Sequence, residues 1–129
     1  MNLTADQARE LAQAFRDMSV AIGDFRFANW DQLTKGQRDS LEDAEWTLLN
    51  HSSDFITQAV GLTLNDVQGS LKRIEDAAAQ AAKAVSTIKT IKKVIDITAA
   101  MVKLGAAIAT ENPSAIASAT GDVFTTVAG

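Results

Sequence analysis

Apolar side chains recur every three or four residues along most of this chain, and this spacing constrains the fold more than any other feature. In the first segment the intervals run 3, 4, 3, 4 and 3, which keeps the side chains on one face of an α-helix. The same intervals would scatter them over both faces of a strand. The residues that carry the pattern are Ala8, Leu11, Phe15, Met18, Ile22 and Phe25. The spacing predicts an all-α protein whose helices turn apolar stripes toward a shared core.

Start and stop signals divide the chain into predicted helices. They cover about 4–27, 35–60, 64–110 and 113–127. Thr4 with Gln7, and Thr34 with Gln37, have the spacing of a capping box at the first two starts. Pro113 both disfavours helical backbone at the residue before it and suits the first turn of a new helix. We expect one domain, an antiparallel bundle of three or four helices with one long helix and an apolar C-terminal helical hairpin.

The long helix of this prediction, residues 64–110, would extend about 70 Å at 1.5 Å per residue. Its apolar series is sustained throughout, and only Lys92 interrupts it. Between Val85 and Thr98, however, nine of fourteen residues are β-branched and lose side-chain rotamer freedom in a helix. We therefore expect a projecting or bent helix, or a division into two.

Charge stops abruptly near residue 93. Residues 1–93 hold 24 charged side chains and residues 94–129 hold four. The single domain, 1–129, is thus an amphipathic body, 1–93, followed by a C-terminal hairpin, 94–129, that is apolar over most of its circumference and requires burial. We expect the following hairpin residues to contact a partner or a membrane: Val94, Ile97, Met101, Leu104, Ile108, Ile116, Val123 and Phe124.

Lysines gather beside this boundary. Residues 77–93 contain four lysines and no acid, whereas residues 1–76 hold 13 acidic and seven basic side chains. Lys89, Lys92, Lys93 and Lys103 share one side of a helix, and we name them the basic flank. This flank is either a solvated face or a surface suited to anionic lipid headgroups.

Composition and spacing argue against most kinds of chemistry. A net charge of −4 argues against nucleic-acid binding, and the absence of cysteine excludes disulfides and thiol catalysis. His51 is the single histidine, so a metal site would need carboxylates for every other ligand. Glu42 and Glu45 share a helix face, but an acidic solvated face is commoner than an acid–base pair. We expect no enzymatic activity, no cofactor, no metal and no small-molecule substrate.

Aromatic side chains surround one arginine. Phe25, Phe27 and Trp30 flank Arg26, a pattern that can stack nucleobases. The acidic surroundings and the helical phase of Phe25 favour core packing instead. Trp46 begins the second of two apolar stripes on the segment 35–60, and we interpret it as a core residue as well.

Long amphipathic helices joined to an Ala- and Gly-rich apolar hairpin resemble the plan of α-helical pore-forming toxins. The segments 104–109 and 115–119 carry this resemblance. It implies a soluble bundle that covers the hairpin until it meets a bilayer. Entry would be conditional, because residues 94–110 are interrupted by Asp96 and Lys103 and are shorter than the roughly 20 apolar residues of a spanning helix.

Three functions therefore stay open. The first is a non-enzymatic interaction or assembly protein that buries the hairpin in a homo-oligomer or against a protein partner. The second is a membrane-active protein that exposes the hairpin to an anionic membrane. The third is an acidic cytosolic immunity or adaptor protein whose first 76 residues bind a basic partner. Because Asp6, Arg9 and Glu10 interrupt any apolar leader, we expect the cytoplasm or export by a route without a signal peptide.

Overall fold

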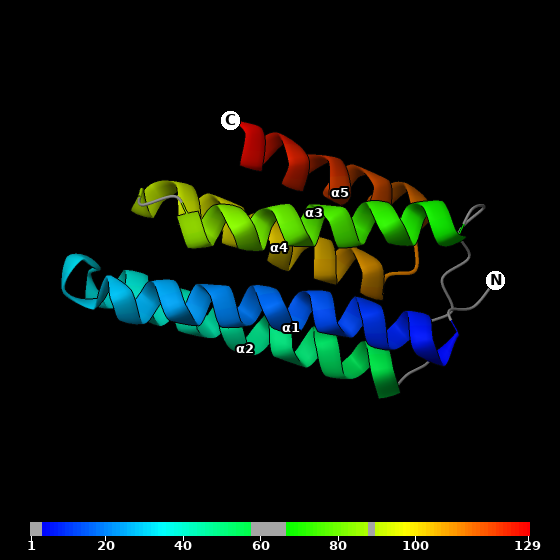
Figure 1. The fold of residues 1–129 in the computed structure, drawn as a ribbon, viewed down its shortest axis with the longest axis horizontal. Coiled ribbons are helices and arrows are strands. Elements are labelled where there is room, and N and C mark those ends of the chain that lie inside the picture. The colour runs from blue at the N-terminus through cyan, green and yellow to red at the C-terminus, as the bar shows by residue number, and fades with distance from the viewer. Residues whose placement is uncertain (1–3, 58–66, 88–89) are drawn as a thin grey trace.

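The computed structural model of the chain describes residues 4–57, 67–87 and 90–129 (Figure 1). These residues form five α-helices and one 3-10 turn, and no strand occurs among them. The helices are α1 (Ala5–Ala28), α2 (Lys35–Thr57), α3 (Val67–Thr87), α4 (Ile91–Ala109) and α5 (Pro113–Ala128), with the 3-10 turn η1 (Trp30–Gln32) between the first two. The predicted all-α helical bundle is confirmed.

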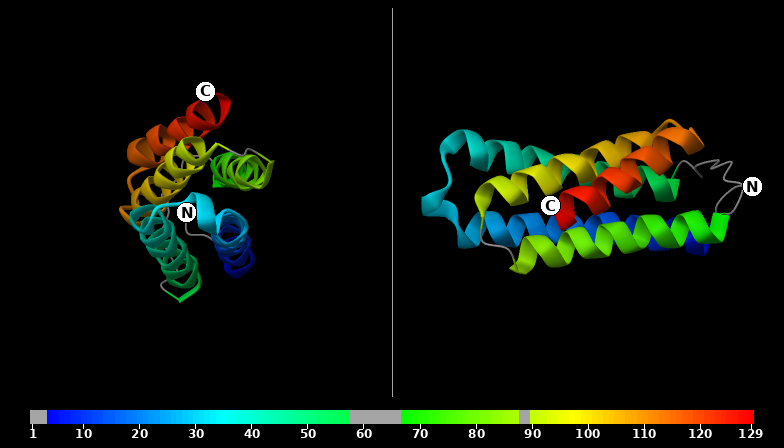
Figure 2. Two further views of the ribbon diagram at one scale, coloured as in Figure 1. Left: turned by 90° about the vertical axis from the view of Figure 1, so that its left-hand side faces the viewer. Right: turned by 90° about the horizontal axis from the view of Figure 1, so that it is seen from above.

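Four of the helices close a bundle and the fifth lies on its outside. α1 packs on α2 and α3, and α4 packs on α2 and α3 from the other side (Figures 1 and 2). α5 packs on α3 and α4 and lies on the far side of this pair from α1 and α2. One outer face of the bundle is therefore covered by a fifth helix, whereas the face formed by α1 and α2 is not.

The helix ends follow the predicted caps. The backbone N–H of Gln7 donates to Thr4 Oγ1 at 3.1 Å, and the Thr4 N–H donates to Gln7 Oε1 at 2.9 Å. Thr34 and Gln37 repeat this reciprocal pair at the start of α2, at 3.1 and 2.9 Å. Asn112 has extended backbone and its side chain accepts from two N–H groups in the first turn of α5. Each cap satisfies backbone donors that a helix start leaves without intrahelical partners.

The predicted long helix is divided into two. α3 ends at Thr87, α4 begins at Ile91, and Thr90 before it has extended backbone with φ −81° and ψ 115°. The division lies within the β-branched stretch, where intrinsic helix propensity is low. Residues 64–66, where the long helix was predicted to start, and residues 58–60, the predicted end of the second helix, lie outside the described residues.

The division also changes which stripe of α4 faces the core. The apolar series predicted through residues 64–109 does not continue as a core stripe, because Ala99, Ala106 and Ala109 are exposed and Ile95 and Val102 are only half-buried. A turn between helices resets the helical phase, so spacing counted across it loses its meaning. The buried stripe of α4 consists of Val94, Ile97, Met101, Leu104 and Ile108.

α4 approaches α1 and α2 closely at Gly105. A Cβ at this position would lie 2.6 Å from Cδ2 of His51 and 3.0 Å from Cε2 of Phe15. Both distances are shorter than ordinary van der Waals contact. The missing side chain is therefore what lets the three helices meet here.

We expect Gly105→Ala to lower the free energy of unfolding by about 1–3 kcal/mol, because the added methyl overpacks a closed contact. Gly121→Ala in α5 is the matched control, since no atom lies within 4 Å of the added Cβ. The control should raise the free energy of unfolding by up to about 1 kcal/mol through helix propensity. Urea denaturation followed by circular dichroism measures both, and equal changes in the two variants would contradict the role of Gly105.

Candidate functional site

The hairpin residues expected to contact a partner or a membrane lie mainly inside the chain's own core. Six of the eight are 0% exposed and Ile116 is 2% exposed. The six are Val94, Ile97, Met101, Leu104, Ile108 and Val123. Phe124 is half-buried, with the guanidinium of Arg73 5.2 Å from its ring centroid. The bundle brings these residues together, and it covers them with helices of the same chain.

The described lysines of the basic flank differ in their exposure to solvent. Lys92 and Lys103 are exposed and Lys93 is half-buried. Lys89 lies outside the described residues. Of the described members, Lys93 and Lys103 line one cavity, and Lys92 is not part of its lining.

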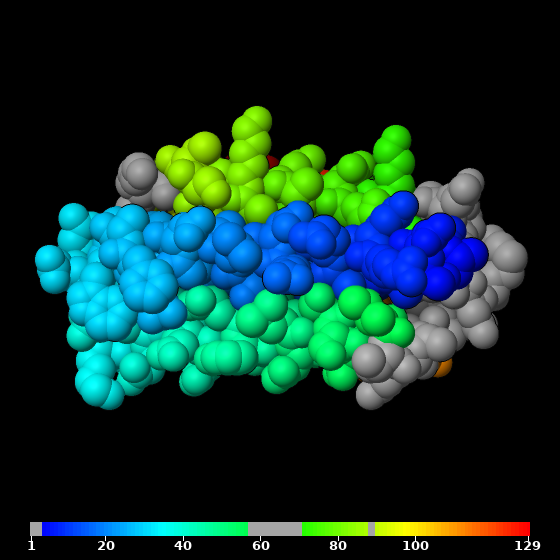
Figure 3. Space-filling model, turned by 60° about the horizontal axis from the view of Figure 1, so that its bottom comes forward, coloured from blue at the N-terminus to red at the C-terminus, as the bar shows by residue number. Residues whose placement is uncertain are grey.

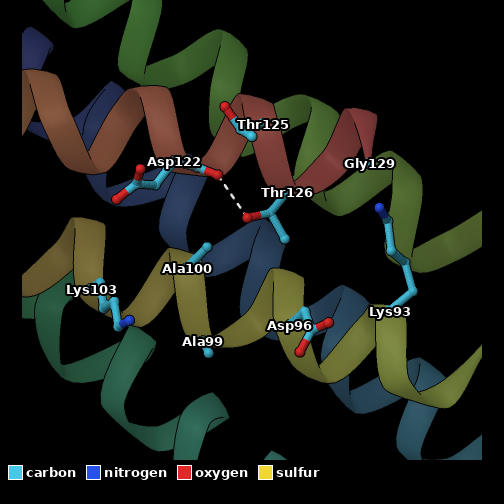
Figure 4. A pocket seen from close by; sticks show the side chains of 9 residues that line it. All are labelled: Lys93, Asp96, Ala99, Ala100, Lys103, Asp122, Thr125, Thr126 and Gly129. Carbon is cyan, nitrogen blue, oxygen red and sulfur yellow. Dashed lines mark hydrogen bonds between the residues drawn. The ribbon is translucent and has the colours of Figure 1, made fainter.

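A cavity of about 530 Å³ lies between α4 and α5 (Figure 4). Its charged lining consists of Lys93, Asp96, Lys103 and Asp122. The hydroxyl of Thr126, also in the lining, donates to the backbone carbonyl of Asp122 at 2.7 Å. Because the lining holds two charges of each sign, the cavity selects no ligand of one charge.

In the described part of the chain, no group of three or more His, Cys, Asp or Glu residues is placed to hold a metal ion. The described helices also include none that combines the length and the apolar character needed to cross a bilayer.

His51 is a packing residue between helices. Its ring stacks on Phe55, with the centroids 6.2 Å apart, and meets the edge of Phe15 at 6.5 Å. Gly105 of α4 faces the same ring, since a Cβ at this glycine would lie 2.6 Å from Cδ2 of His51. Burial lowers the pKa of His51, and the nearby charge of Asp54 opposes this more weakly. The fold therefore favours the neutral imidazole.

Large apolar side chains that are exposed in the described residues all lie on α1, η1 and α2. They are Val20, Phe27, Trp30, Trp46 and Ile56, which are 54%, 68%, 43%, 62% and 54% exposed. We call these five residues the exposed apolar face of the α1–α2 pair, and Figure 3 views this pair from its outer side. Val20 lies at its edge, because it also lines a groove with Ala82 and Lys83 of α3. Scattered exposed apolar residues are ordinary, but their concentration on one face is typical of an interaction surface.

Core packing of Phe27, Trp30 and Trp46 was predicted wrongly. Phe25 is buried as expected, at 5% exposure, but Phe27 is two residues further along and points away from the core. Likewise, Trp46 is two residues from the fully buried Leu48, which places it about 200° away around α2. Of the second predicted stripe of this helix, Trp46 and Ile56 are exposed, Leu49 is half-buried, and Val60 lies outside the described residues.

An ion pair joins α1 to α2 beneath this face. Nε of Arg26 donates to Oε2 of Glu45 at 2.6 Å, and the two side chains are only 10% and 16% exposed. The hydroxyl of Ser19 donates to the Glu45 backbone carbonyl at 3.0 Å. Gly23 leaves the space, because a Cβ there would lie 2.7 Å from Oε1 of Glu45. The hydrogen bond to Glu45 raises the pKa of Arg26.

Arginines also order the aromatic rings at the α1–α2 turn. Phe27 and Trp30 stack with their planes 10° apart and centroids 6.1 Å apart. The Arg26 guanidinium carbon lies 4.6 Å from the Phe27 centroid, and that of Arg38 lies 4.7 Å from the Trp30 centroid. Arg38 is anchored in turn, because its Nη1 donates to the carbonyls of Trp30 and Leu33 at 2.9 and 2.8 Å. Cation–π contacts thus hold two exposed rings in set positions.

The sequence offered little signal for this arrangement. Arg26 and Glu45 are 19 positions apart, and only the closed bundle brings them together. A glycine at position 23, in the middle of a strongly periodic helix, was the one local sign of a close approach.

We expect Arg26→Met to lower the free energy of unfolding by about 2–3 kcal/mol, because it leaves Glu45 largely buried without its charged donor. Combining it with Glu45→Leu should recover part of the loss. Lys35→Ala is the matched control, since it removes an exposed ion pair with Asp39 and should change the free energy by less than about 0.5 kcal/mol. Equal losses at the two pairs in chemical denaturation would contradict the importance of burial.

We also expect stability to fall on mild acidification through His51. The folded-state pKa of His51 is lowered from its ordinary value of 6.5, so the unfolded chain takes up the proton first. Stability is therefore full above that value and is lost as pH falls below it toward the lower folded pKa. Desolvation raises the pKa of Glu75, which acts in the opposite direction and is common to both proteins compared below.

The measurement is urea denaturation at about pH 7.5 and about pH 5.5 for the unaltered protein and for His51→Gln. The variant should lose less stability between the two pH values than the unaltered protein. Identical pH dependence in both would exclude His51 as the source.

Comparison of the chain with protein-family models, with curated protein sequences and with solved structures finds no match in any of the three.

Proposed function

We propose that this protein is a non-enzymatic interaction protein that binds an amphipathic helix of a partner protein across the exposed apolar face. The observation that carries the proposal is the concentration of exposed large apolar side chains on the α1–α2 pair. The hairpin contributes core to this module and not its contact surface, since its apolar stripe is already covered.

The shape of the occupant is argued from the bundle itself. The α3–α4 pair carries a fifth helix, α5, which packs against both of its members. The α1–α2 pair is the corresponding face on the other side, and no described helix covers it (Figure 2). A helix laid across two helices buries an apolar stripe with full internal hydrogen bonding of its own backbone, which suits such a face.

The aromatic side chains add affinity because they are ordered in advance. Phe27 and Trp30 are stacked on one another and held by Arg26 and Arg38. Ordering side chains on binding opposes association by about 0.5–1.5 kcal/mol for each mobile side chain. Rings that are already fixed avoid part of this opposing term, and Trp and Tyr are enriched among residues that dominate binding energies.

A second copy of the chain is a poorer occupant of this face. Residues 17–46 hold seven acidic and three basic side chains, so a symmetric dimer through the exposed apolar face would oppose two acidic surfaces. Like charges brought together in an interface disfavour association. We therefore propose a partner of different sequence.

Binding can be followed by the intrinsic fluorescence of the protein, because Trp30 and Trp46 are its two tryptophans and it has no tyrosine. We expect a tryptophan-free amphipathic helical peptide of about 18 residues, five turns, to shift the emission to shorter wavelength. Phe27→Ser and Trp46→Ser should each weaken its binding about tenfold or more in calorimetric titration. Their thermal unfolding should stay nearly unchanged, since both side chains are exposed.

Ala117→Ser, on the exposed side of α5, is the control and should bind like the unaltered protein. The proposal is overturned if amphipathic peptides with cationic, neutral and anionic polar faces all leave the emission unchanged. It is also overturned if the Phe27 and Trp46 variants bind as tightly as the control.

A further inference from the structure

We infer that the partner helix is cationic, with lysine or arginine flanking its apolar stripe on the side that meets the α1–α2 turn. This inference rests on the proposed function and adds the charge of the bound helix and the end of the face at which its cations lie. It is argued from which charges beside the exposed apolar face are already engaged and which are not.

Acidic side chains lie one helical turn from the exposed apolar residues. Asp24 is four residues after Val20 on α1, and Glu42 is four residues before Trp46 on α2. Both are exposed, as is Asp43, three residues before Trp46. Residues three or four apart are neighbours on a helix surface, so these carboxylates border the face directly.

Each basic side chain within residues 17–46 is already engaged by the chain. Arg26 is paired with Glu45 at 2.6 Å, and Lys35 with Asp39 at 2.9 Å. Arg38 donates to two backbone carbonyls and lies over the Trp30 ring. No ion pair joins Asp24, Glu42 or Asp43 to a basic residue in the described part of the chain. Two basic groups lie near these carboxylates, since Lys83 of α3 lines a groove with Asp24, and the charge of Glu42 adds to the effect of Glu45 in raising the pKa of Arg26. Residues 17–46 nevertheless hold four more acidic than basic side chains, and this excess negative charge is left for a partner to neutralise.

The other end of the face differs, which gives the site a direction. The Ser52 hydroxyl donates to the Ala12 carbonyl at 2.8 Å, so the part of α2 that carries Ile56 lies beside the first turns of α1. There Arg9 pairs with Asp6 at 3.1 Å, and Arg16 is exposed. Glu10 and Asp54 are exposed at this end too, but Glu10 lines a pocket with Lys72 and Glu75 of α3, and Asp54 lies two residues, about 200°, from Ile56 around α2. The carboxylates that border the face are therefore at the turn end, and a bound helix gains most when its cations lie there.

Because the carboxylates are at the exposed rim, they contribute chiefly to association rate, orientation and salt dependence.

The test uses the full chain and three tryptophan-free peptides of about 18 residues with one common apolar stripe. Their polar positions are lysine, glutamine or glutamate. We expect the lysine peptide to bind about tenfold tighter than the glutamine peptide at low salt and the glutamate peptide to bind weakest. The advantage of lysine should shrink as salt screens the exposed charges.

Variants locate the effect. The double substitution Asp24→Asn with Glu42→Gln should weaken the lysine peptide about fivefold and leave the glutamine peptide within about twofold. Asp122→Asn, which removes one acid from the opposite side of the bundle, should change neither. Two lysine peptides with their cations clustered at the N-terminal or at the C-terminal end should differ in affinity, because one of them places its cations at the turn, and Arg16→Gln should reduce that difference.

The outcomes separate the two claims. Equal or tighter binding of the glutamine or glutamate peptide overturns the cationic partner and leaves the helix-binding function standing. Loss of all peptide binding overturns the function itself. A scrambled lysine peptide with equal charge but no apolar stripe must bind weakly, because tight binding by it would show attraction by charge alone and overturn both.

Discussion

The apolar stripe of α4 has to be removed from water, and the arrangement of the other helices depends on that requirement. Fully burying a side chain such as leucine or isoleucine contributes about 1.5–3 kcal/mol, and the stripe holds five large residues. α1, α2 and α3 each supply one amphipathic face to it, and Gly105 lets the backbones approach where His51 and Phe15 meet α4. A helix as apolar as α4 is stable only when such neighbours enclose it.

Enclosing α4 leaves the bundle with two unlike outer faces. On one side, α5 follows α4 after the Asn112–Pro113 turn and covers the α3–α4 pair, so the two most apolar helices of the chain are neighbours. On the other side, α1 and α2 have nothing to cover their outer stripe among the described helices. The exposed apolar face is thus a consequence of chain order: the fifth helix can reach one side of the bundle only.

Polar interactions determine how rigid that face is. Arg26 links the α1–α2 interface to the exposed aromatic rings, because it is paired with Glu45 in that interface and also lies against Phe27. A largely buried pair of this kind contributes little net stability compared with apolar residues, but it fixes the relative position of the two helices through a directional bond. The aromatic rings at the turn are held in position by the same arginine, and a surface whose side chains are already ordered is suited to recognition.

Much of the fold could be predicted from the sequence. Local interactions decide where helices start and stop, and the capping boxes at Thr4 and Thr34 and the stop at Pro113 are local. The separation of charge into an acidic, amphipathic body and a nearly uncharged hairpin is likewise visible in composition alone. These features determined the fold class, most of the helix boundaries and the need to bury the hairpin.

The tertiary structure decided the rest. The break before Ile91 reset the phase of α4, so the choice between its two apolar stripes depended on which one met α1 and α2. The same holds for α2, where packing buried Leu48 and left Trp46 in solvent. The presence of an apolar residue indicates that its burial is favourable, but it does not indicate which neighbour will cover it. Likewise, the Arg26–Glu45 pair forms only when two segments distant in sequence are adjacent. The sequence by itself therefore determined what had to be covered, whereas only the packed bundle decided what stayed exposed, because exposure depends on the whole arrangement of helices and not on any one of them.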